Sequence, residues 1–254
     1  MGTNNGNAKS DMNHFSIEIA GLIIGIDAIS TGIYGYCIRY LTDKSPVVRV
    51  GITEEELHKE ILKNKKYRKV PNEVYLESIG IYRKIAEYAL SHDVLLMHGA
   101  VIAHKKDAFM FVASSGTGKT THIRQWLLND KEAYVVNGDK PLIRINSKEA
   151  FACGSPWNGK EEMGTNATVR LNAIIILERS NENHIEEIPF KAAYPYLLEY
   201  SHRPEDIAKM KKTIDLLMRL NGKVRFFKFY INNFKKDCFP MAYNKLIQTV
   251  ENAV

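Results

Sequence analysis

The feature that most constrains this chain is the stretch of residues 109–121, which reads FMFVASSGTGKTT. A short apolar run of strand type leads into a small, glycine-rich segment. Lys119, Thr120 and Thr121 then open a segment with helical spacing. A strand, a glycine-rich loop, a Lys-Ser/Thr pair and a helix form the phosphate-binding loop, or P-loop. The stretch therefore predicts a site for the phosphates of a nucleotide.

The small residues have a physical purpose in such a loop. Backbone N–H groups must point inward and touch phosphate oxygens, and a side chain at Gly116 or Gly118 would obstruct that approach. The start of the following helix adds unpaired N–H donors and the positive end of its dipole. Lys119 would reach the β- and γ-phosphates and the Thr120 hydroxyl would hold Mg²⁺. The predicted nucleotide-binding residues are Ser115, Gly116, Thr117, Gly118, Lys119, Thr120 and Thr121.

The motif departs from the usual pattern at one position. Glycine is expected six residues before the lysine, and Ala113 stands there. The alternative interpretation is a Gly/Ser/Thr loop that happens to precede a lysine. The agreement of Gly118-Lys119-Thr120 with the strand-to-helix context favours the phosphate-binding interpretation.

Composition narrows the classes of function. With 254 residues, 45% of them hydrophobic and 25% charged, the chain is expected to fold with a real core, as one large domain or as a domain with a smaller lobe. A net charge of +6 favours anionic ligands, but no dense basic tract with interleaved aromatic residues indicates a nucleic-acid partner. The three cysteines are far apart and suggest neither a disulfide framework nor a zinc site. No apolar run approaches the ~18 residues of a membrane span, and the N-terminus lacks the apolar core of a signal peptide, so we expect a cytoplasmic protein without a membrane partner.

Three segments are predicted along the chain: a disordered leader (1–13), a small, mostly β N-terminal lobe (14–70) and a P-loop kinase-like domain (71–254). In the lobe we expect strands within residues 15–29, 34–40 and 47–52. Thr53 to Glu56 resembles a capping box that opens a helix to about Lys63.

The larger domain is predicted to be α/β, with a P-loop core whose mixed sheet is flanked by helices. The pattern predicts a helix over 71–92, strands at 101–103 and 109–112 around a polar bend, a helix over 120–128, strands at 133–137 and 142–145, a loop over 150–164, a buried central strand over 170–178, an edge strand over 224–231 and a helix over 243–250. Ile207, Met210, Ile214, Leu217 and Met218 form a stripe that we interpret as the core face of another helix.

A P-loop alone indicates a nucleotide phosphate, and chemistry on that phosphate also needs a carboxylate for the metal and a group that takes a proton. Asp139 is the best candidate, because it follows a predicted strand and lies where an acid could meet Mg²⁺. The alternative is that Gly138-Asp139-Lys140-Pro141 is only a turn. His98 precedes the strand that pairs with the P-loop strand, so its imidazole is a candidate proton carrier, with a packed structural histidine as the alternative. Lys160 and Arg170 are candidate clamps for phosphate or substrate.

These motifs together resemble a known family. Residues 113–120, ASSGTGKT, resemble the GxSGxGK[ST] loop of the HPr kinase/phosphorylases, and His98-Gly99 and the strand that ends at Asp139 resemble two further segments of that family. Phosphoenolpyruvate carboxykinase shares the same nucleotide-binding core. The resemblance covers residues 95–178, and the chain looks like a small, divergent member of this group. Gly138 occupies the place of the first of the family's two acidic residues, and the family's C-terminal signature is absent.

The resemblance implies an ATP- and Mg²⁺-dependent phosphotransferase that acts on a hydroxyl, such as a serine of a peptide or small protein. Catalysis would involve Asp139, His98 and Lys119, and Thr120 and Asp139 would hold Mg²⁺. Asp139 would serve as both metal ligand and base, or His98 would assist. The alternative is a nucleotide-binding regulatory or pseudo-kinase module without fast chemistry, motivated by the acid missing at Gly138. A metabolic, carboxykinase-like enzyme is a third hypothesis, for which the chain is short. The sequence leaves open the acceptor, the donor (ATP, GTP or pyrophosphate), phosphorylase activity and the oligomeric state.

Overall fold

The computed structural model describes residues 12–64, 71–114, 116–232 and 238–251. The chain divides into two compact units, Met1–Ile85 and Ala86–Val254. The predicted leader, 1–13, lies almost wholly outside the described residues. The division falls within a long helix, α3 (Glu73–Ala89), whereas the sequence-based division after residue 70 placed that whole helix in the larger domain.

The smaller unit contains a three-stranded sheet in the order β1-β2-β3. Strands β1 (His14–Ile19) and β2 (Leu22–Asp27) form an antiparallel hairpin, and β3 (Val48–Gly51) pairs parallel with β2. Ile17, Ile24 and Ile26 are fully buried in it. The predicted capping box is confirmed at the start of α2 (Glu54–Asn64): the Glu56 amide donates to Thr53 Oγ1 at 3.2 Å, and the Thr53 amide donates to the Glu56 carboxylate at 2.8 Å.

One predicted strand in this unit is wrong. Residues 34–40 belong to helix α1 (Gly32–Cys37) and a 3₁₀ turn, η1 (Ile38–Tyr40). Ile33 and Cys37 are the buried residues of α1, and they lie four positions apart, on one helical face. With Tyr40 of η1, the buried residues are spaced four and three positions apart, which is a helical period and not the period of two that a strand requires.

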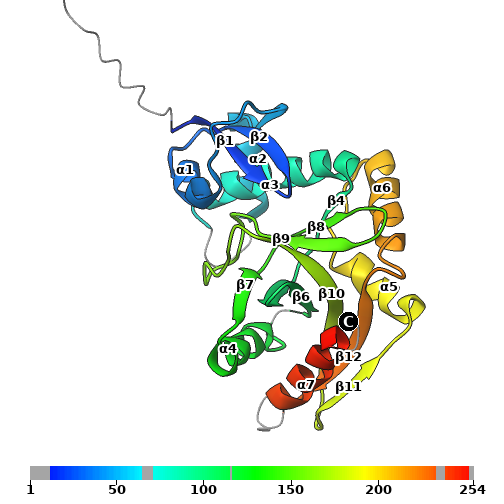
Figure 1. Ribbon diagram of the computed structural model, residues 1–254. Coiled ribbons are helices and arrows are strands. Elements are labelled where there is room, and N and C mark those ends of the chain that lie inside the picture. Colours follow the sequence, from blue (N-terminus) through cyan, green and yellow to red (C-terminus); the bar gives the residue numbers. More distant parts are fainter. Residues whose placement is uncertain (1–11, 65–70, 115, 233–237, 252–254) are drawn as a thin grey trace, which may run out of the picture. The chain divides into compact units, whose positions relative to one another are not determined.

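The larger unit is built on a nine-stranded mixed sheet (Figure 1). Its main path runs β4-β8-β9-β10-β6-β5-β7, with β12 on β10 and β11 on β12. The strands are β4 (Val94–Leu96), β5 (Ala100–His104), β6 (Asp107–Val112), β7 (Ala133–Asn137), β8 (Leu142–Ile145), β9 (Ala150–Cys153), β10 (Thr168–Arg179), β11 (His184–Glu187) and β12 (Arg225–Ile231). The helical elements are η2 (Leu90–His92), α4 (Lys119–Asn129), α5 (Phe190–Glu199), α6 (Ile207–Met218) and α7 (Cys238–Glu251).

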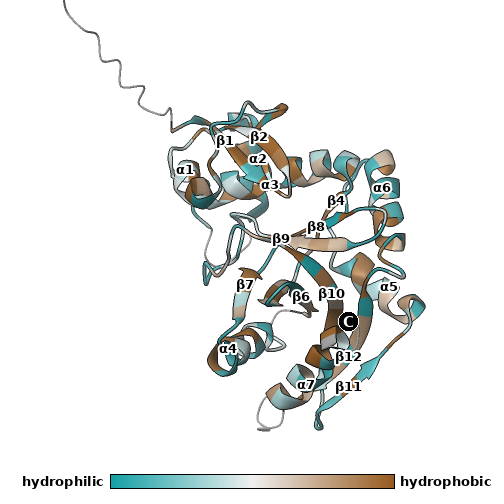
Figure 2. Cartoon of the chain, viewed as in Figure 1, coloured by the Kyte–Doolittle hydropathy of each residue, from teal (hydrophilic) through white to brown (hydrophobic). Residues whose placement is uncertain are grey.

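Strand β10 organises this sheet. It runs parallel to β6 along one side, and its other side pairs first with β9 and then with β12. Seven of its twelve residues are buried, as expected for a strand covered on both faces. Figure 2 shows the hydrophobic residues gathered on these central strands, while β11 is largely hydrophilic.

Alternate residues of the central strands pack on opposite faces of the sheet. Phe109 and Phe111 of β6 belong to a hydrophobic cluster with Trp126 of α4 and Leu246 of α7. Their neighbours along the strand belong to a second cluster, which includes residues of α5 and α6. Helices therefore cover both faces of the sheet, and the molecule is a mixed α/β protein.

Several expectations for this unit need correction. β12 is not an edge strand, because it pairs with both β10 and β11. Residues 150–153 of the expected loop form β9. The expected core stripe of α6 is mostly wrong, since Ile207, Ile214 and Met218 are exposed and Leu217 alone of the five residues is buried. The buried face of that helix is formed by Thr213, Leu216 and Leu217.

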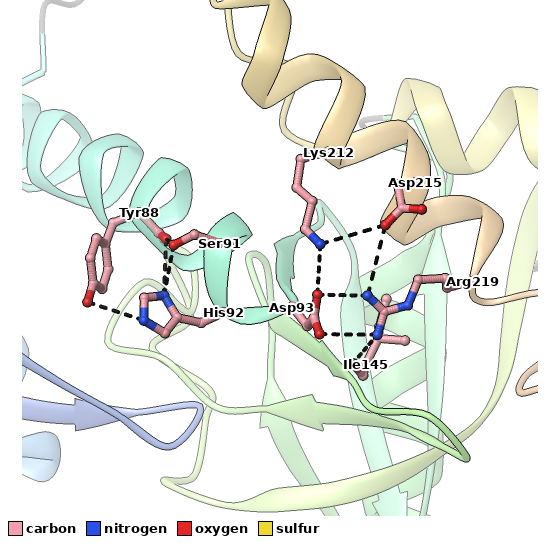
Figure 3. A network of polar contacts seen from close by, with 8 residues as sticks. All are labelled: Tyr88, Ser91, His92, Asp93, Ile145, Lys212, Asp215 and Arg219. Atoms are coloured by element: carbon pink, nitrogen blue, oxygen red, sulfur yellow. Dashed lines mark hydrogen bonds and ion pairs between the residues drawn. The ribbon is translucent and has the colours of Figure 1, made fainter.

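A polar network fixes α6 to the start of β4 (Figure 3). Asp93 has a left-handed backbone, with φ of 59°, and it ends the turn η2. Its carboxylate accepts hydrogen bonds from Arg219 (2.7 and 3.3 Å) and Lys212 (2.9 Å). These contacts hold the pKa of Asp93 down to about 2.

No helix among the described residues is both long and apolar enough to cross a membrane.

Candidate functional site

Strand pairing brings three separate segments to one edge of the larger sheet. β5 lies antiparallel between β6 and β7, with Ala100 opposite Phe111 and Val101 opposite Asn137. β6 and β7 are therefore parallel to one another, and their carboxyl ends lie beside the start of β5. The loop after β6, the turn after β7 and the residues before β5 meet at this edge. These segments carry Lys119, Asp139 and His98.

The loop between β6 and α4 has the conformation that its glycines allow. Gly116 and Gly118 have φ of +78° and +116°, a region that side chains rarely adopt, and Gly118 caps α4. The loop closes on the Ser114 carbonyl, which accepts from the Thr117 amide (3.3 Å) and hydroxyl (2.9 Å). Ser115, a predicted nucleotide-binding residue, lies outside the described residues.

The first turn of α4 has backbone donors to offer. Within the part of the chain that the structure describes, the amides of Lys119, Thr120 and Thr121 have no hydrogen-bond acceptor. Both threonines are exposed to solvent. A helix start of this kind, reached through a glycine-rich turn, is suited to an anion.

Ala113, the departure from the usual motif, is accommodated without strain. It is 1% exposed and packs in the cluster of Phe109 and Phe111. It is not among the described residues with positive φ, so its methyl group costs no backbone strain. Its carbonyl accepts from Lys119 Nζ at 3.2 Å, which folds the lysine back over the loop.

The Lys119 amine is half-buried and electrostatically coupled to the turn after β7. Burial lowers the pKa of Lys119, the Asp139 carboxylate acts in the opposite direction, and Lys140 lowers it further. The lysine and the aspartate, 20 positions apart in the sequence, therefore lie within electrostatic range of each other.

Asp139 lies at the centre of a small charged cluster. One carboxylate oxygen is 3.1 Å from His98 Nε2, and the other is bound by Lys140 Nζ. Burial alone would raise the pKa of Asp139, but the hydrogen bond with His98 and the charge of Lys140 outweigh it and hold this pKa well below the usual aspartate range. Asp139 is thus an ionised carboxylate and a weak base.

The turn that carries Asp139 is rigidly supported. The buried Asn137 side chain accepts from the amides of Asp139 (2.9 Å) and Lys140 (2.7 Å), and its own amide donates to Ser155 Oγ at 3.0 Å. The Gly138 amide donates to the Met163 carbonyl at 2.9 Å. A Cβ atom at Gly138 would lie 2.8 Å from the Asn158 carbonyl oxygen and 3.1 Å from that of Met163. The position of the missing acid is therefore packed against backbone and leaves no room for a side chain.

His98 is held from its other side by the end of α5. The His98 amide donates to the Tyr200 carbonyl at 2.6 Å, and the two rings lie edge to face at 6.4 Å. The Tyr200 hydroxyl is 3.3 Å from Ser114 Oγ in the loop. The His98 side chain is 47% exposed, so its imidazole is open to a bound molecule.

Lys160 lies next to this cluster. A Cβ atom at its neighbour Gly159 would be 2.9 Å from Asp139 Cβ, and its other neighbour, Glu161, pairs with Arg124 of α4 at 2.6 Å. The turn at 159–162, which carries Lys160, therefore lies between Asp139 and α4. Lys160 is exposed and has no polar partner among the described residues.

The structure does not bring Arg170 to this edge. Arg170 is paired in register with Asp107 at the start of β6, and it forms an ion pair with that buried carboxylate at 2.5 Å. The six residues of β6 separate it from the loop by about 17 Å. Arg170 instead lines a hollow of about 450 Å³ at the opposite edge, with Lys105, Lys106 and Phe151.

Three residues of the site were missed by the sequence interpretation. Lys140 was noted only as part of a turn. Tyr200 carried no local signal, because it comes from a helix that was not predicted. Arg179, whose Nη2 donates to the Gly116 carbonyl, is the last residue of β10. The sequence could have indicated Arg179, because it is a cation at the carboxyl end of an apolar strand.

The arrangement brings together hard oxygen donors, cations and an imidazole. Among the described residues, no three His, Cys, Asp or Glu side chains are grouped to hold a metal ion on their own. A magnesium ion needs fewer protein ligands, since one or two carboxylates and the phosphates of a substrate complete its shell. The ionised Asp139 and the Thr120 hydroxyl fit that role by their chemistry.

Comparison with known proteins gives a distant similarity of fold. No protein-family model matches the sequence, and no curated protein matches it. One solved structure that does match is the HPr(Ser) kinase/phosphatase from Coxiella burnetii, at 9% sequence identity and a TM-score of 0.37. The match covers 62% of this chain and 94% of that one.

Proposed function

We propose that the chain binds a nucleoside triphosphate, ATP in the first instance, together with Mg²⁺, and transfers the terminal phosphoryl group to a hydroxyl of a peptide or small protein. One observation carries the proposal. The half-buried Lys119 amine at the start of α4 lies in the field of an ionised Asp139, and Asp139 is in turn in contact with the exposed His98. A phosphate cradle, a metal carboxylate and a proton acceptor are the parts that phosphoryl transfer requires.

In this proposal each group has one task. The backbone amides of the first turn of α4 and the side-chain amine of Lys119 hold the phosphate oxygens. Asp139 and Thr120 would hold Mg²⁺, which would neutralise the charge that develops on the phosphates. Lys140 binds Asp139 in this structure. In the proposed nucleotide complex it moves to the phosphates, and Lys160 extends over them from the turn at 159–162.

The electrostatics of the cluster favour His98 over Asp139 as the proton acceptor. The lowered pKa of Asp139 makes its carboxylate a poor base at neutral pH. A neutral His98 that donates from Nε2 to Asp139 keeps a lone pair on Nδ1, and that nitrogen takes the proton of the acceptor hydroxyl. The hydroxyl oxygen bonds to the γ-phosphorus, the bond to the bridging oxygen breaks and ADP leaves.

The test begins with binding. Calorimetry with Mg·ATP on the wild-type protein should give a measurable affinity, and Lys119→Ala should weaken it at least about tenfold. Lys106→Ala is the matched control, because it removes an exposed lysine from the turn between β5 and β6 at the opposite edge of the sheet. Absence of ATP binding by the wild type, or an equal effect of the two substitutions, would refute the proposal.

A second candidate function is nucleotide binding without fast chemistry. It is favoured by Gly138, where no second acid fits, and by Lys140, which neutralises the remaining acid. Transfer of label from γ-labelled ATP to a peptide library separates the two functions. Tight Mg·ATP binding without transfer to any peptide favours the second, and GTP and pyrophosphate in the same binding assay identify the donor.

A further inference from the structure

We propose that Arg179 binds the nucleoside end of the ligand, so that the polyphosphate tail runs across the loop from Arg179 toward Asp139. The inference rests on the proposed nucleotide function and adds an orientation and a contact for the base. The first observation is the register of β10 with β6. β10 runs parallel to β6, with Ile176 opposite Val112, so Arg179 emerges three residues later beside the loop that follows β6.

The position of Arg179 relative to the loop decides which end of the ligand it meets. The strand order β10-β6-β5-β7 places β10 on one side of the loop and the turn of Asp139, after β7, on the other. Three strand spacings separate β10 from β7, about 14 Å. His98, Lys119 and Asp139, the groups suited to the reacting phosphoryl group, gather on the β5–β7 side. The part of the ligand on the Arg179 side is therefore the part farthest from the reaction.

The contacts of Arg179 suit this task. Its Nη2 donates to the Gly116 carbonyl, which holds the guanidinium against the loop, and the side chain is otherwise exposed. Arg170, Arg219 and Arg225 each pair with a carboxylate, whereas Arg179 has no carboxylate partner among the described residues. A planar cation fixed by one edge keeps a face free, and such a face stacks on an aromatic base.

Affinity measurements with three ligands test the inference: Mg²⁺ complexes of ATP, ADP and inorganic tripolyphosphate, at one ionic strength. We expect Arg179→Ala to weaken ATP and ADP by a similar factor, at least about fivefold, because both carry the base. Tripolyphosphate, which has no base, should bind the variant as it binds the wild type. Arg179→Lys should recover less than half of the loss, since an ammonium group has no planar face. Lys106→Ala controls for the change of net charge.

Each other outcome overturns the inference in a recognisable way. Equal weakening of all three ligands by Arg179→Ala would show that Arg179 acts on the phosphates or on loop order. Full recovery by lysine would show that charge alone matters. Wild-type protein that binds tripolyphosphate as tightly as ATP would show that no residue holds the nucleoside. If the wild type binds none of the three, the proposed function itself fails, which is a different result from the others.

Discussion

Replacement of Gly138 by alanine tests whether the place of the missing acid is closed by packing. The added Cβ would lie 2.8 and 3.1 Å from two backbone carbonyl oxygens, those of Asn158 and Met163. Backbone atoms cannot swing away as the end of a flexible side chain can, so the segment 158–163 must move. That movement also stretches the hydrogen bond from the Gly138 amide to the Met163 carbonyl.

The cost follows from these two effects. Overpacking of a well-packed site costs about 1–3 kcal/mol, and loss of a backbone hydrogen bond adds about 1 kcal/mol. We therefore expect Gly138→Ala to lower the free energy of unfolding by about 2–4 kcal/mol. With a urea dependence of about 2 kcal/mol/M, the midpoint of unfolding should fall by about 1–2 M.

Intrinsic fluorescence is the suitable probe. The chain has two tryptophans, and both Trp126 and Trp157 are buried in the larger unit, so their emission reports on the unit that contains Gly138. The matched control is Gly222→Asn, where a Cβ meets nothing within 4 Å and asparagine tolerates the φ of +77°. That control should change stability by less than about 1 kcal/mol.

The reasoning is refuted if Gly138→Ala unfolds at the same urea concentration as the control. In that case the loop would yield freely, and an acid at this position would be possible. If the expected loss is found, nucleotide affinity should fall with it, because displacement of the turn moves the carboxylate of Asp139.

Three further predictions concern charge and pH. Asp139→Asn should be less stable than the wild type at pH 7, and the difference should shrink on acidification below about pH 4, because stabilisation from a carboxylate with a lowered folded pKa disappears as pH falls through that pKa; equal differences in urea unfolding at pH 7 and pH 3 would contradict this. His122 is buried with its pKa lowered to about 4, so the unfolded chain binds its proton first and the wild type should lose about 2 kcal/mol between pH 7 and pH 5. His122→Gln should flatten this dependence, and an unchanged slope would exclude His122 as its source. Asp93→Asn, which removes the charge in the network of Figure 3 but tolerates the left-handed backbone, should cost about 1 kcal/mol at pH 7 in thermal or urea unfolding, and this cost should shrink as pH falls from about 4 through the folded pKa of about 2; a cost that is the same at pH 7 and pH 2 would assign the effect to packing.

Local patterns were reliable where a few neighbouring residues decide the structure. The segment around Lys119 is a strand, a turn with two left-handed glycines and a helix, as expected, because glycine positions and apolar spacing act within about ten residues. The capping box at Thr53 and Glu56 is another such case, since both partners lie within one helical turn. The strand expected over residues 34–40 was wrong, because the buried pair Ile33 and Cys37, four positions apart, selected a helix.

The candidate site likewise has one part that local sequence patterns predict and another part that they do not. The sequence by itself determined the glycine-rich loop, the lysine at the head of α4 and the short list that contained Asp139, His98 and Lys160, because their residue types and flanking patterns carry that information. Only the tertiary structure decided which of them meet. The order and register of the strands placed Asp139 against His98, sent Arg170 to the far edge of the sheet and delivered Arg179 to Gly116. The physical reason is that strand pairing joins segments tens of residues apart, and a pattern read along the chain contains no measure of that distance.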